Sequence, residues 1–454
     1  MSDLAIINPA TEGQIALVAN HDLEATDQAI DRAARAFPAW RKVTPVDRSR
    51  LLRRFADVVD AHVEELAQLE VANAGHTISN ARWEAGNVRD VLAYYAGAPE
   101  RHAGRQIPVA GGVDLTFYEP LGVVGIIVPW NFPMPIAAWG LGPALAAGNT
   151  VVMKPATFTP LTAVRLAELG LEAGLPEGVF EVVTGEGALV GNRFVTHPAV
   201  RKVCFTGSNA VGRLIMEGCA QQVKRVTLEL GGKSANIIFA DADLEKAAAS
   251  APYAVFDNAG QDCCARSRIL VEDSAYDRFM ELFEPAVKAV KVLDPREDAS
   301  EMGPLITAAQ RESVMGFVDE AEVAFRGSAP EGPGYWMAPT VLATTDTTSR
   351  AFREEIFGPV VSVVRFRDEA DAVRLANESI FGLSGSIWSR DIGRALRVAR
   401  GVETGALSVN SNSSVRYSTP FGGFKQSGLG RELGPDALLG FSEEKNVFIA
   451  TEDN

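Results

Sequence analysis

A cysteine and a glutamate on separate glycine-containing turns carry the clearest chemistry in this sequence. Cys263 follows a Gly-Gln turn in the run Asn258-Ala-Gly-Gln-Asp-Cys-Cys264, and the segment Glu229-Leu-Gly-Gly232 lies upstream of it. A deprotonated thiol is a strong covalent nucleophile, and glycine lets a turn present it without steric cover. A carboxylate from the second turn could activate the water that releases a covalent intermediate. Because most buried cysteines are inert small hydrophobes, this interpretation depends on the rest of the chain.

Two further polar residues follow apolar runs, at positions where ligands gather. Asn131 lies in Pro129-Trp-Asn-Phe-Pro133, and Lys154 ends the next apolar run. In open α/β sheets, ligands bind at the carboxyl ends of strands. The flanking prolines fix the backbone, so Asn131 could direct its amide toward a developing oxyanion, and Lys154 could bind a ribose or phosphate. The alternatives are a structural asparagine in a turn and a lysine that covers solvated surface.

Two glycine-rich loops have the strand-then-helix setting that favours an anion. Gly207-Ser-Asn-Ala-Val-Gly212 follows an apolar run and opens a helical segment, whose N-terminal amides attract negative charge. It is not a P-loop, because Arg213 and Leu214 stand where Lys and Ser or Thr are required. Gly185-Glu-Gly-Ala-Leu-Val-Gly191 misses the G-x-G-x-x-G spacing by one residue. Taken alone, each loop is better explained by ordinary turn chemistry.

Composition and charge predict a soluble intracellular protein of several domains. The chain has 454 residues, 47% hydrophobic and 22% charged, and exceeds the size at which one core stops growing, so we expect two or three domains. The formal net charge of -15 argues against nucleic acid or an anionic membrane as a partner. Four cysteines without a C-x-x-C predict reduced thiols, a cytoplasmic location and no metal site. We expect no signal peptide and no membrane span.

The hydrophobic pattern predicts an α/β fold with two sheets. Three- and four-residue spacing predicts helices over residues 25–40, 45–73 and 78–95. Apolar runs alternating with helical segments then predict a parallel sheet of the doubly wound, nucleotide-binding type and a second α/β domain that carries Cys263. We expect the strands of the first sheet at 123–128, 150–153, 179–183 and 202–205, and those of the second at 235–239, 268–271, 360–364 and 405–409, with helices at 242–255, 274–291 and 368–379. Two strands outside both sheets, 112–118 and 445–450, could pair and extend toward a neighbouring subunit.

Taken together, these motifs resemble those of the aldehyde dehydrogenase superfamily. The resemblance runs from Asn8-Pro-Ala-Thr11 to the final strand, in the family's order, through Pro129-Trp-Asn-Phe-Pro133, Lys154-Pro-Ala156, Phe205-Thr-Gly-Ser208, Glu229-Leu-Gly-Gly-Lys233, Gly260-Gln-Asp-Cys263, Glu354-Glu-Ile-Phe-Gly-Pro359 and Pro420-Phe-Gly-Gly-Phe-Lys425. It implies a Rossmann-type cofactor domain (residues 1–101 and 121–231), an α/β catalytic domain (232–427) and a small β oligomerisation element (102–120 and 428–454). It also implies a homo-oligomer, either dimer or tetramer.

The resemblance further implies an activity, the NAD(P)+-dependent oxidation of an aldehyde to a carboxylic acid. Cys263 would form a thiohemiacetal and then a thioester, Asn131 and the Cys263 backbone N–H would bind the oxyanion, and Glu229 would activate the hydrolytic water. A CoA-acylating relative would pass the thioester to CoA, but such enzymes often lack the base that Glu229 supplies. A non-catalytic protein on this scaffold is disfavoured because all three residues are present. None of the five histidines lies near Cys263 in sequence, so no local signature supports a Cys-His dyad.

The family pattern also implies a set of cofactor-binding residues, with one departure at Thr157. NAD-preferring members often carry Glu at that position, where a carboxylate accepts a hydrogen bond from the ribose 2′-OH and repels a 2′-phosphate. Thr157 does neither strongly, so we expect NADP to be used at least comparably to NAD, with Lys154 pairing the phosphate. The implied set is Trp130, Lys154, Thr157, Gly187, Gly207, Ser208, Val211, Gly212, Leu230, Glu355 and Phe357.

The implied substrate pocket is rich in aromatic residues, which suits an apolar or aromatic aldehyde. Asp262 could instead attract the cation of an aminoaldehyde, and Arg416 could receive a substrate carboxylate. Each of these charges is more simply a rim residue that faces water. The pocket positions are Phe132, Trp139, Asp262, Cys264, Val415 and Phe421.

Overall fold

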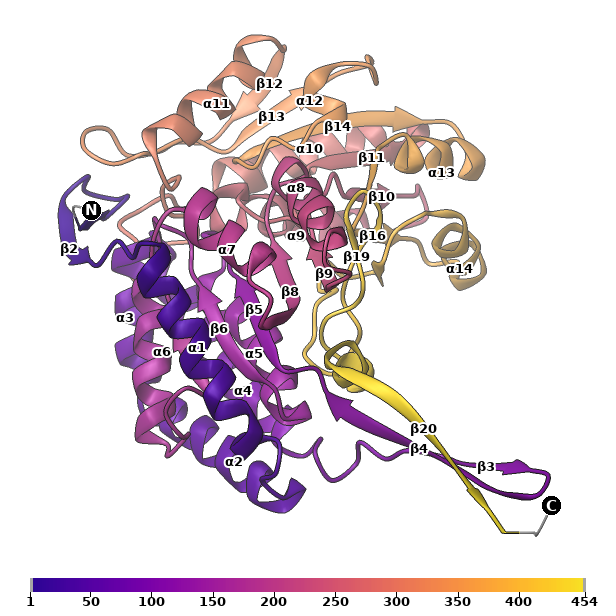
Figure 1. Ribbon diagram of the computed structural model, residues 1–454. Helices are drawn as coiled ribbons and strands as arrows, with labels where there is room; N and C mark the ends of the chain where they lie inside the picture. The colour runs from indigo at the N-terminus through magenta and orange to yellow at the C-terminus, as the bar shows by residue number, and fades with distance from the viewer. Residues whose placement is uncertain (1–2, 452–454) are drawn as a thin grey trace.

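The N-terminal part of the chain forms a β-hairpin and then four helices (Figure 1). The computed structural model describes residues 3–451. The hairpin does not follow from the hydrophobic pattern because most of its side chains are partly or fully exposed. These elements are β1 (Leu4–Ile7), β2 (Gln14–Val18), α1 (Leu23–Trp40), α2 (Pro45–Ala61), α3 (Val63–Ala74) and α4 (Ile78–Ala96).

The single helix predicted over residues 45–73 is wrong, because the chain breaks at His62 into α2 and α3. His62 has φ -114° and ψ 14°, outside the helical region, and its ring Nδ1 lies 2.8 Å from the carbonyl oxygen of Val58. The apolar spacing continues across this break, so periodicity alone does not reveal it. The start of α2 is well marked, since Thr44 accepts a hydrogen bond from the Asp47 amide and Pro45 occupies the first turn.

A six-stranded sheet follows, with strand order β19-β9-β8-β5-β6-β7. All neighbours are parallel except the short β19, which runs antiparallel to β9. The first parallel sheet predicted from the sequence is confirmed. Strand β9 also belongs to this sheet, but it is not among the strands that the sequence predicts. Its strands are β5 (Val123–Ile127), β6 (Thr150–Lys154), β7 (Phe180–Val182), β8 (Val200–Thr206), β9 (Arg225–Glu229) and β19 (Gly428–Leu429), and its helices are α5 (Pro133–Ala147), α6 (Leu161–Glu172), α7 (Asn192–Thr196) and α8 (Asn209–Ala220).

The second large sheet has seven strands, in the order β12-β13-β14-β11-β10-β16-β17. Its strands are parallel apart from the β12–β13 pair. The four strands predicted for the second sheet are confirmed as β10, β11, β14 and β17, and β12, β13 and β16 are additions. The strands are β10 (Ala235–Ile238), β11 (Arg268–Glu272), β12 (Val323–Arg326), β13 (Thr340–Ala343), β14 (Val360–Phe366), β16 (Ser384–Trp388) and β17 (Ala406–Val409). The helices are α9 (Leu244–Phe256), α10 (Tyr276–Lys288), α11 (Ala308–Asp319), α12 (Arg350–Arg353), α13 (Glu369–Asn377) and α14 (Ile392–Gly401).

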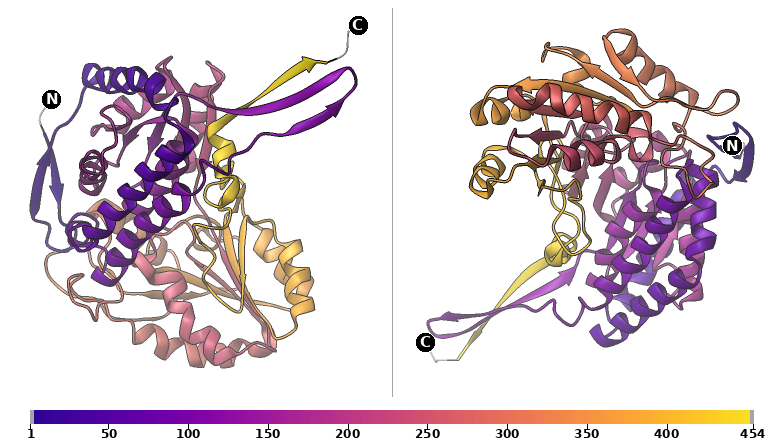
Figure 2. Two further views of the ribbon diagram at one scale, coloured as in Figure 1. Left: turned by 90° about the horizontal axis from the view of Figure 1, so that it is seen from below. Right: turned by 180° about the vertical axis from the view of Figure 1, so that it is seen from behind.

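A three-stranded arm projects away from both sheets (Figures 1 and 2). It consists of β3 (Gln106–Val109), β4 (Gly112–Pro120) and β20 (Ser442–Ala450), and β20 runs antiparallel to β4 from Ser442 opposite Pro120 to Ala450 opposite Gly112. The expected pairing of the two outlying strands is therefore confirmed. Residues 428–429, which the resemblance assigns to the oligomerisation element, instead join the six-stranded sheet as β19.

The two sheets are linked by the segments that carry the candidate functional residues. The chain passes from β9, which ends at Glu229, to β10, which begins at Ala235 in the other sheet. Cys263 lies between α9 and β11, in a loop of the second sheet. Within residues 3–451, no helix has the length and apolar character that a membrane crossing requires.

Candidate active site

The loop that carries Cys263 has an unusual backbone conformation. It begins in η2 (Asp257–Gly260), where Asn258 (φ 49°), Ala259 (φ 54°) and Gly260 (φ 70°) are left-handed in succession. A Cβ at Gly260 would stand 2.1 Å from a neighbouring main-chain oxygen, so this position requires glycine. Other residue types in the left-handed region cost ~1–3 kcal/mol each and cluster at active sites and ligand clamps.

Gln261 fixes this loop to the predicted oxyanion donor, Asn131. The Gln261 Nε2 donates to the carbonyl oxygen of Asn258 at 3.1 Å, and its Oε1 accepts from the Ile306 amide at 2.8 Å. Its main-chain oxygen accepts from the Asn131 side-chain amide at 3.0 Å, while Asn258 Nδ2 donates to the main-chain oxygen of Asn131 at 2.7 Å. Asn131 is thus held against the loop that carries Cys263 by both its side chain and its main chain.

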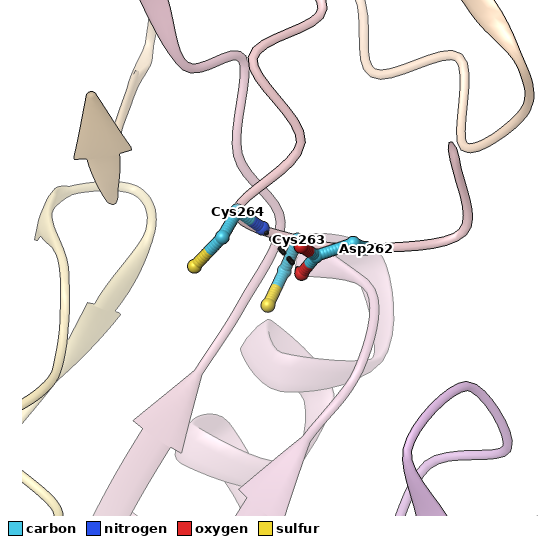
Figure 3. A group of neighbouring side chains, drawn as sticks. All are labelled: Asp262, Cys263 and Cys264. Carbon is cyan, nitrogen blue, oxygen red and sulfur yellow. Dashed lines mark hydrogen bonds between the residues drawn. The ribbon is translucent and has the colours of Figure 1, made fainter. Parts of the chain in front are cut away.

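Cys263 and Cys264 project toward the same side of the loop (Figure 3). Cys263 is half-buried, Cys264 is buried, and both are free thiols. The Asp262 carboxylate accepts a hydrogen bond from the Cys264 main-chain amide at 2.8 Å, which holds the turn. The Cys264 thiol, then burial and the charges of Asp262 and Glu229, raise the pKa of Cys263 well above its ordinary value. A thiol with a raised pKa holds its proton more tightly, and this proton must leave before the sulfur becomes a nucleophile.

Glu229, the last residue of β9, has the properties of a strong buried base. It is buried, and its Oε1 has no hydrogen-bond partner among the described residues. Burial, followed by the nearby carboxyl of Glu432 and the thiol of Cys264, raises the pKa of Glu229 well above its ordinary value. A carboxylate with a raised pKa accepts a proton more readily, as a general base requires.

Two glycines let the chain after Glu229 pass between the Cys263 loop and Glu355. The Gly232 amide donates to Glu355 Oε1 at 2.8 Å, and a Cβ at Gly231 would stand 2.2 Å from Glu355 Oε2. On the other side, a Cβ at Gly232 would stand 2.2 Å from the carbonyl oxygen of Cys263. The Glu-Leu-Gly-Gly motif therefore lies directly against the loop of the candidate nucleophile.

A cavity of about 190 Å³ opens beside Cys263. Arg416, the alternative partner for a substrate carboxylate, is exposed and is not among the residues that line this cavity. Trp139 and Phe421 pack edge to face in its wall, with ring centroids 5.4 Å apart. Every residue of the predicted substrate pocket lines it, namely Phe132, Trp139, Asp262, Cys264, Val415 and Phe421. Sequence reasoning missed other lining residues. Trp83 and Glu84 on α4 and Tyr253 on α9 come from helices that no motif marks, whereas Asp257 and Arg266 lie close to Cys263 in sequence.

Most of the predicted cofactor residues lie along one edge of the six-stranded sheet, the edge formed by the carboxyl ends of its parallel strands. Those that come from this sheet follow the carboxyl ends of parallel strands, where nucleotides bind in doubly wound folds. They are Trp130 after β5, Lys154 and Thr157 at and after β6, Gly187 after β7, Gly207, Ser208, Val211 and Gly212 after β8, and Leu230 after β9.

The same edge contains a capped helix start and a pair of packed aromatic rings. The Ser208 hydroxyl accepts a hydrogen bond from the Val211 amide at 3.5 Å and caps α8. Glu355 and Phe357 come from the other sheet, between α12 and β14, and Phe357 packs edge to face on Trp130 with ring centroids 5.2 Å apart. Both sheets thus contribute residues to the predicted cofactor site.

Lys154 lies at this edge, at the end of β6. The side chain is buried, and its Nζ donates to the carbonyl oxygen of Pro155 at 2.8 Å. Burial lowers the pKa of Lys154 to about 8, partly opposed by the carboxylate of Glu186. A buried amine with further N–H groups to donate fits a ribose hydroxyl or phosphate. Thr157 is half-buried on the same edge and offers a hydroxyl instead of a carboxylate.

The chain is similar over its length to proteins of known name. The model of the aldehyde dehydrogenase family matches residues 2–447. A betaine aldehyde dehydrogenase of Bacillus subtilis (strain 168) is 38% identical over 99% of this chain and 94% of its own length. A phenylacetaldehyde dehydrogenase of Pseudomonas fluorescens is 40% identical over 98% of this chain and 92% of its own length.

Solved structures show the same relationship. A betaine aldehyde dehydrogenase from Staphylococcus aureus in complex with NAD+ has a TM-score of 0.96 and 38% identity, covering 100% of this chain and 92% of that one. An NADP-dependent enzyme from E. coli has a TM-score of 0.96 and 38% identity, covering 99% and 95%. The chain therefore belongs to the aldehyde dehydrogenase family and is an NAD(P)-dependent aldehyde dehydrogenase.

Proposed function

We propose that the protein oxidises its aldehyde to a free carboxylic acid by covalent catalysis at Cys263. The sulfur attacks the carbonyl carbon, and the resulting oxyanion is bound by the Asn131 side-chain amide and the Cys263 main-chain N–H. Loss of a hydride from the same carbon converts this thiohemiacetal into a thioester, and NAD(P)+, when bound, accepts the hydride. The observation that carries the proposal is that the Asn131 amide and Gly232 both contact the Cys263 loop.

Glu229 is the proposed carrier of protons in both halves of the reaction. It first accepts the proton of the Cys263 thiol and passes it to solvent, which frees the carboxylate to remove a proton from the water that attacks the thioester; that second proton then goes to the departing sulfur. Cleavage of the C–S bond returns the sulfur as a thiol and releases the acid. The burial of Glu229 and its unpartnered Oε1 support this role, because the carboxylate is basic and has an oxygen free to bind water.

Burst kinetics test the two residues separately. Cys263→Ser removes the thiolate, so NAD(P)H formation falls to background. Glu229→Gln impairs both halves: the thiol proton must pass to water without the carboxylate, so the burst of one NAD(P)H per site is slower, and turnover then stalls because no base activates the hydrolytic water. Cys219→Ala, which alters a buried thiol on α8, is the matched control and keeps full activity. Full NAD(P)H production by Cys263→Ser contradicts the proposal.

Hydrolysis is proposed over transfer of the acyl group to CoA. A buried carboxylate with a free oxygen suits activation of water, whereas a CoA thiol needs an open approach to the thioester. Product analysis with and without added CoA distinguishes the two reactions. We expect free carboxylate in both cases, and acyl-CoA as the main product contradicts hydrolysis.

The proposed cofactor preference follows from Thr157 and Lys154. The half-buried Thr157 presents no carboxylate to repel a 2′-phosphate, and the buried Lys154 supplies a cation or a neutral donor nearby. We therefore propose that NADP is used at least comparably to NAD. The relatives include a structure in complex with NAD+ and one described as NADP dependent, so both cofactors occur on this scaffold.

The proposed substrate is an apolar or aromatic aldehyde. Phe132, Trp139 and Phe421 supply aromatic wall to the cavity beside Cys263. An aminoaldehyde is the second candidate, because Asp262 and Asp257 also line that cavity and a cation is attracted to both carboxylates and aromatic faces. A panel of aliphatic, aromatic, amino- and carboxy-aldehydes decides between them. The highest kcat/KM on an aminoaldehyde would favour the second candidate.

We further propose a cytoplasmic homo-oligomer, dimeric or tetrameric, built through the β3–β4–β20 arm. The arm has open strand edges on β3 and β20, and it exposes the apolar side chains Phe117, Phe448 and Ile449. Exposed strand edges with apolar side chains favour pairing with another chain. Free thiols at all four cysteines fit a reducing compartment. Light scattering on wild type and Ile449→Glu tests the interface, and an unchanged mass contradicts it.

A further inference from the structure

Arg266 is a buried cation that lines the cavity beside Cys263 and has no part in the reaction proposed above. Its exposed fraction is 3%, and it lies three residues after the nucleophile. Burying a guanidinium is costly unless its N–H groups are bonded. The oxygens to which Arg266 donates therefore show where this side chain acts.

The guanidinium of Arg266 joins two segments of the cavity wall. Its Nη1 donates to the main-chain oxygen of Cys264 at 2.6 Å. Its Nη2 donates to the Ser414 hydroxyl oxygen at 2.8 Å and to the Asn412 main-chain oxygen at 3.1 Å, with a longer contact of 3.4 Å to the main-chain oxygen of Gly385 in β16. Cys264, Asn412 and Ser414 all line the cavity. Because a guanidinium is planar and its N–H groups have fixed directions, these bonds set the separation of the two segments.

The segment that carries the nucleophile is also fixed by other hydrogen bonds. The main-chain N–H of Arg266 donates to the carbonyl oxygen of Ala254 at 2.9 Å, and the Asp262 carboxylate accepts from the Cys264 amide at 2.8 Å. The Gln261 side chain holds the start of the same loop, with its Oε1 accepting from the Ile306 amide at 2.8 Å. This side of the cavity therefore keeps its shape without the guanidinium.

The opposite segment depends more on side-chain contacts. Residues 410–423, between β17 and the short β18 (Phe424–Lys425), form neither helix nor strand. Besides Arg266, the Ser384 hydroxyl lies 2.9 Å from that of Ser414, and Asn412 Nδ2 donates to the main-chain oxygen of Ser250 at 3.2 Å. Loss of the guanidinium thus releases this segment more than it releases the Cys263 loop.

We infer that Arg266 is a positioning residue for the substrate: it holds residues 412–415, the 412–415 wall, at a fixed separation from the Cys263 loop and so determines which aldehydes bind well. This inference rests on the proposed role of the cavity as the aldehyde site. A bulky aldehyde gains binding energy by contact with the wall, whereas a short aldehyde bonded to the sulfur does not need that contact. Arg266 therefore acts mainly on the KM of bulky aldehydes.

Two substitutions separate the geometry of the guanidinium from its charge. Arg266→Met keeps the length of the side chain and removes its donors, and Arg266→Lys keeps the positive charge but lacks the planar fork that spans both segments. Steady-state kinetics compare propanal with phenylacetaldehyde. For both variants we expect KM for phenylacetaldehyde to rise about tenfold, with kcat and both constants for propanal within about threefold of wild type.

A second measurement does not depend on turnover. Cys263 is alkylated in the absence of cofactor by iodoacetamide and, separately, by the larger N-benzyl-iodoacetamide, and peptide mapping confirms the modified thiol. An ordered wall binds the benzyl group near the sulfur. We expect both Arg266 variants to lose about tenfold in the rate with the benzyl reagent and to keep the wild-type rate with iodoacetamide.

A milder variant and a matched control complete the set. Ser414→Ala removes only the hydroxyl on the side of the 412–415 wall, so KM for phenylacetaldehyde rises about threefold, and adding it to Arg266→Met has little further effect. Arg48→Met is the control, since Arg48 is also buried and donates at 3.0 Å to the main-chain oxygens of Ala146 and Val43, but does not line the cavity. It keeps both KM values. Thermal melts show which variants are folded.

Four results would overturn the inference: a wild-type KM for phenylacetaldehyde in folded Arg266→Met, full rescue by Arg266→Lys, equal losses with the two aldehydes, or additive losses for Arg266→Met and Ser414→Ala. If the Arg266 variants do not fold, an unchanged KM in Ser414→Ala overturns it. If the wild type oxidises neither aldehyde, the proposed function fails instead, and the two alkylating reagents still decide whether Arg266 orders the wall.

Discussion

Gly232 lies directly against the main-chain carbonyl oxygen of Cys263, so close that a Cβ at residue 232 would stand 2.2 Å from that oxygen. Real Cβ atoms do not approach a main-chain oxygen so closely, and backbone cannot swing aside as the end of a side chain can. Gly232→Ala therefore pushes the Cys263 loop away from the segment that carries Glu229. We expect kcat to fall by ~10²-fold or more, because a displacement of about 1 Å in an active site costs that much.

Steady-state kinetics with a melting curve check this prediction. Gly316→Ala is the control, since Gly316 lies in α11 and a Cβ there meets no atom within 4 Å. That variant keeps full activity and gains stability, because alanine is the better helix former by roughly 1 kcal/mol. Full activity in a folded Gly232→Ala variant would show that the contact between the two segments is dispensable.

The sequence predicts the sheets well because their central strands are buried on both faces. The runs at β5, β6, β8, β10, β11 and β14 consist largely of buried residues, so apolar character alone identifies them. The outer strand β12 alternates half-buried and exposed residues and carries a weaker signal. β9 is missed because it begins with the exposed, charged Arg225 and a half-buried residue, so its apolar run is short.

The residues of the candidate site that belong to short local motifs can be predicted from the sequence. The contacts that hold them together form only in the folded chain and cannot be predicted in this way. Cys263, Glu229 and Asn131 each belong to a short motif, and the structure packs the three segments against one another. Asn258 and Gln261 belong to the same run as Cys263, but their hydrogen bonds to Asn131, which is far away in sequence, exist only in the fold. The edge-to-face packing of His76 on Phe132, the residue after Asn131, also exists only in the fold.

Removal of the Cys264 thiol is predicted to make Cys263 more reactive. The Cys264 side chain is the foremost cause that raises the pKa of Cys263, so Cys264→Ala lowers that pKa and increases the thiolate fraction near pH 8. The measurement is the rate of alkylation by iodoacetamide against pH. We expect the midpoint of the profile to move to lower pH, whereas Cys219→Ala leaves it in place. An unmoved midpoint in Cys264→Ala would show that burial and the charges of Asp262 and Glu229 set the acidity of Cys263 without a contribution from Cys264.

Glu70 is predicted to make the folded protein less stable as pH rises. Its pKa is about 8 in the folded chain, raised by burial and Glu84 from 4.5, so the folded state binds the proton more tightly than the unfolded state. Between about pH 5 and 8 the free energy of unfolding therefore falls with pH, by at most ~1.4 kcal/mol per pH unit from this group. Glu70→Gln removes the contribution of Glu70 to this fall in the free energy of unfolding with pH.

Chemical denaturation from pH 5 to 8 measures the difference in slope between wild type and Glu70→Gln. Glu64→Gln is the control on the same helix, because pairing with Arg82 lowers the pKa of Glu64 to about 2 and it stays ionised across this range. Parallel pH profiles for wild type and Glu70→Gln would show that Glu70 is already ionised in the folded protein at pH 5.

Thr157 is predicted to set the choice between the two nicotinamide cofactors. In wild type we expect kcat/KM for NADP to equal or exceed that for NAD, because Thr157 leaves room and no negative charge for a 2′-phosphate. Thr157→Glu adds a carboxylate that accepts a hydrogen bond from the ribose 2′-OH and repels the phosphate, so NADP efficiency falls by roughly 10²-fold while NAD efficiency is kept. Thr157→Gln, similar in size but uncharged, separates repulsion from bulk. Initial rates with each cofactor decide the matter, and a roughly hundredfold NAD preference in wild type would refute the assignment.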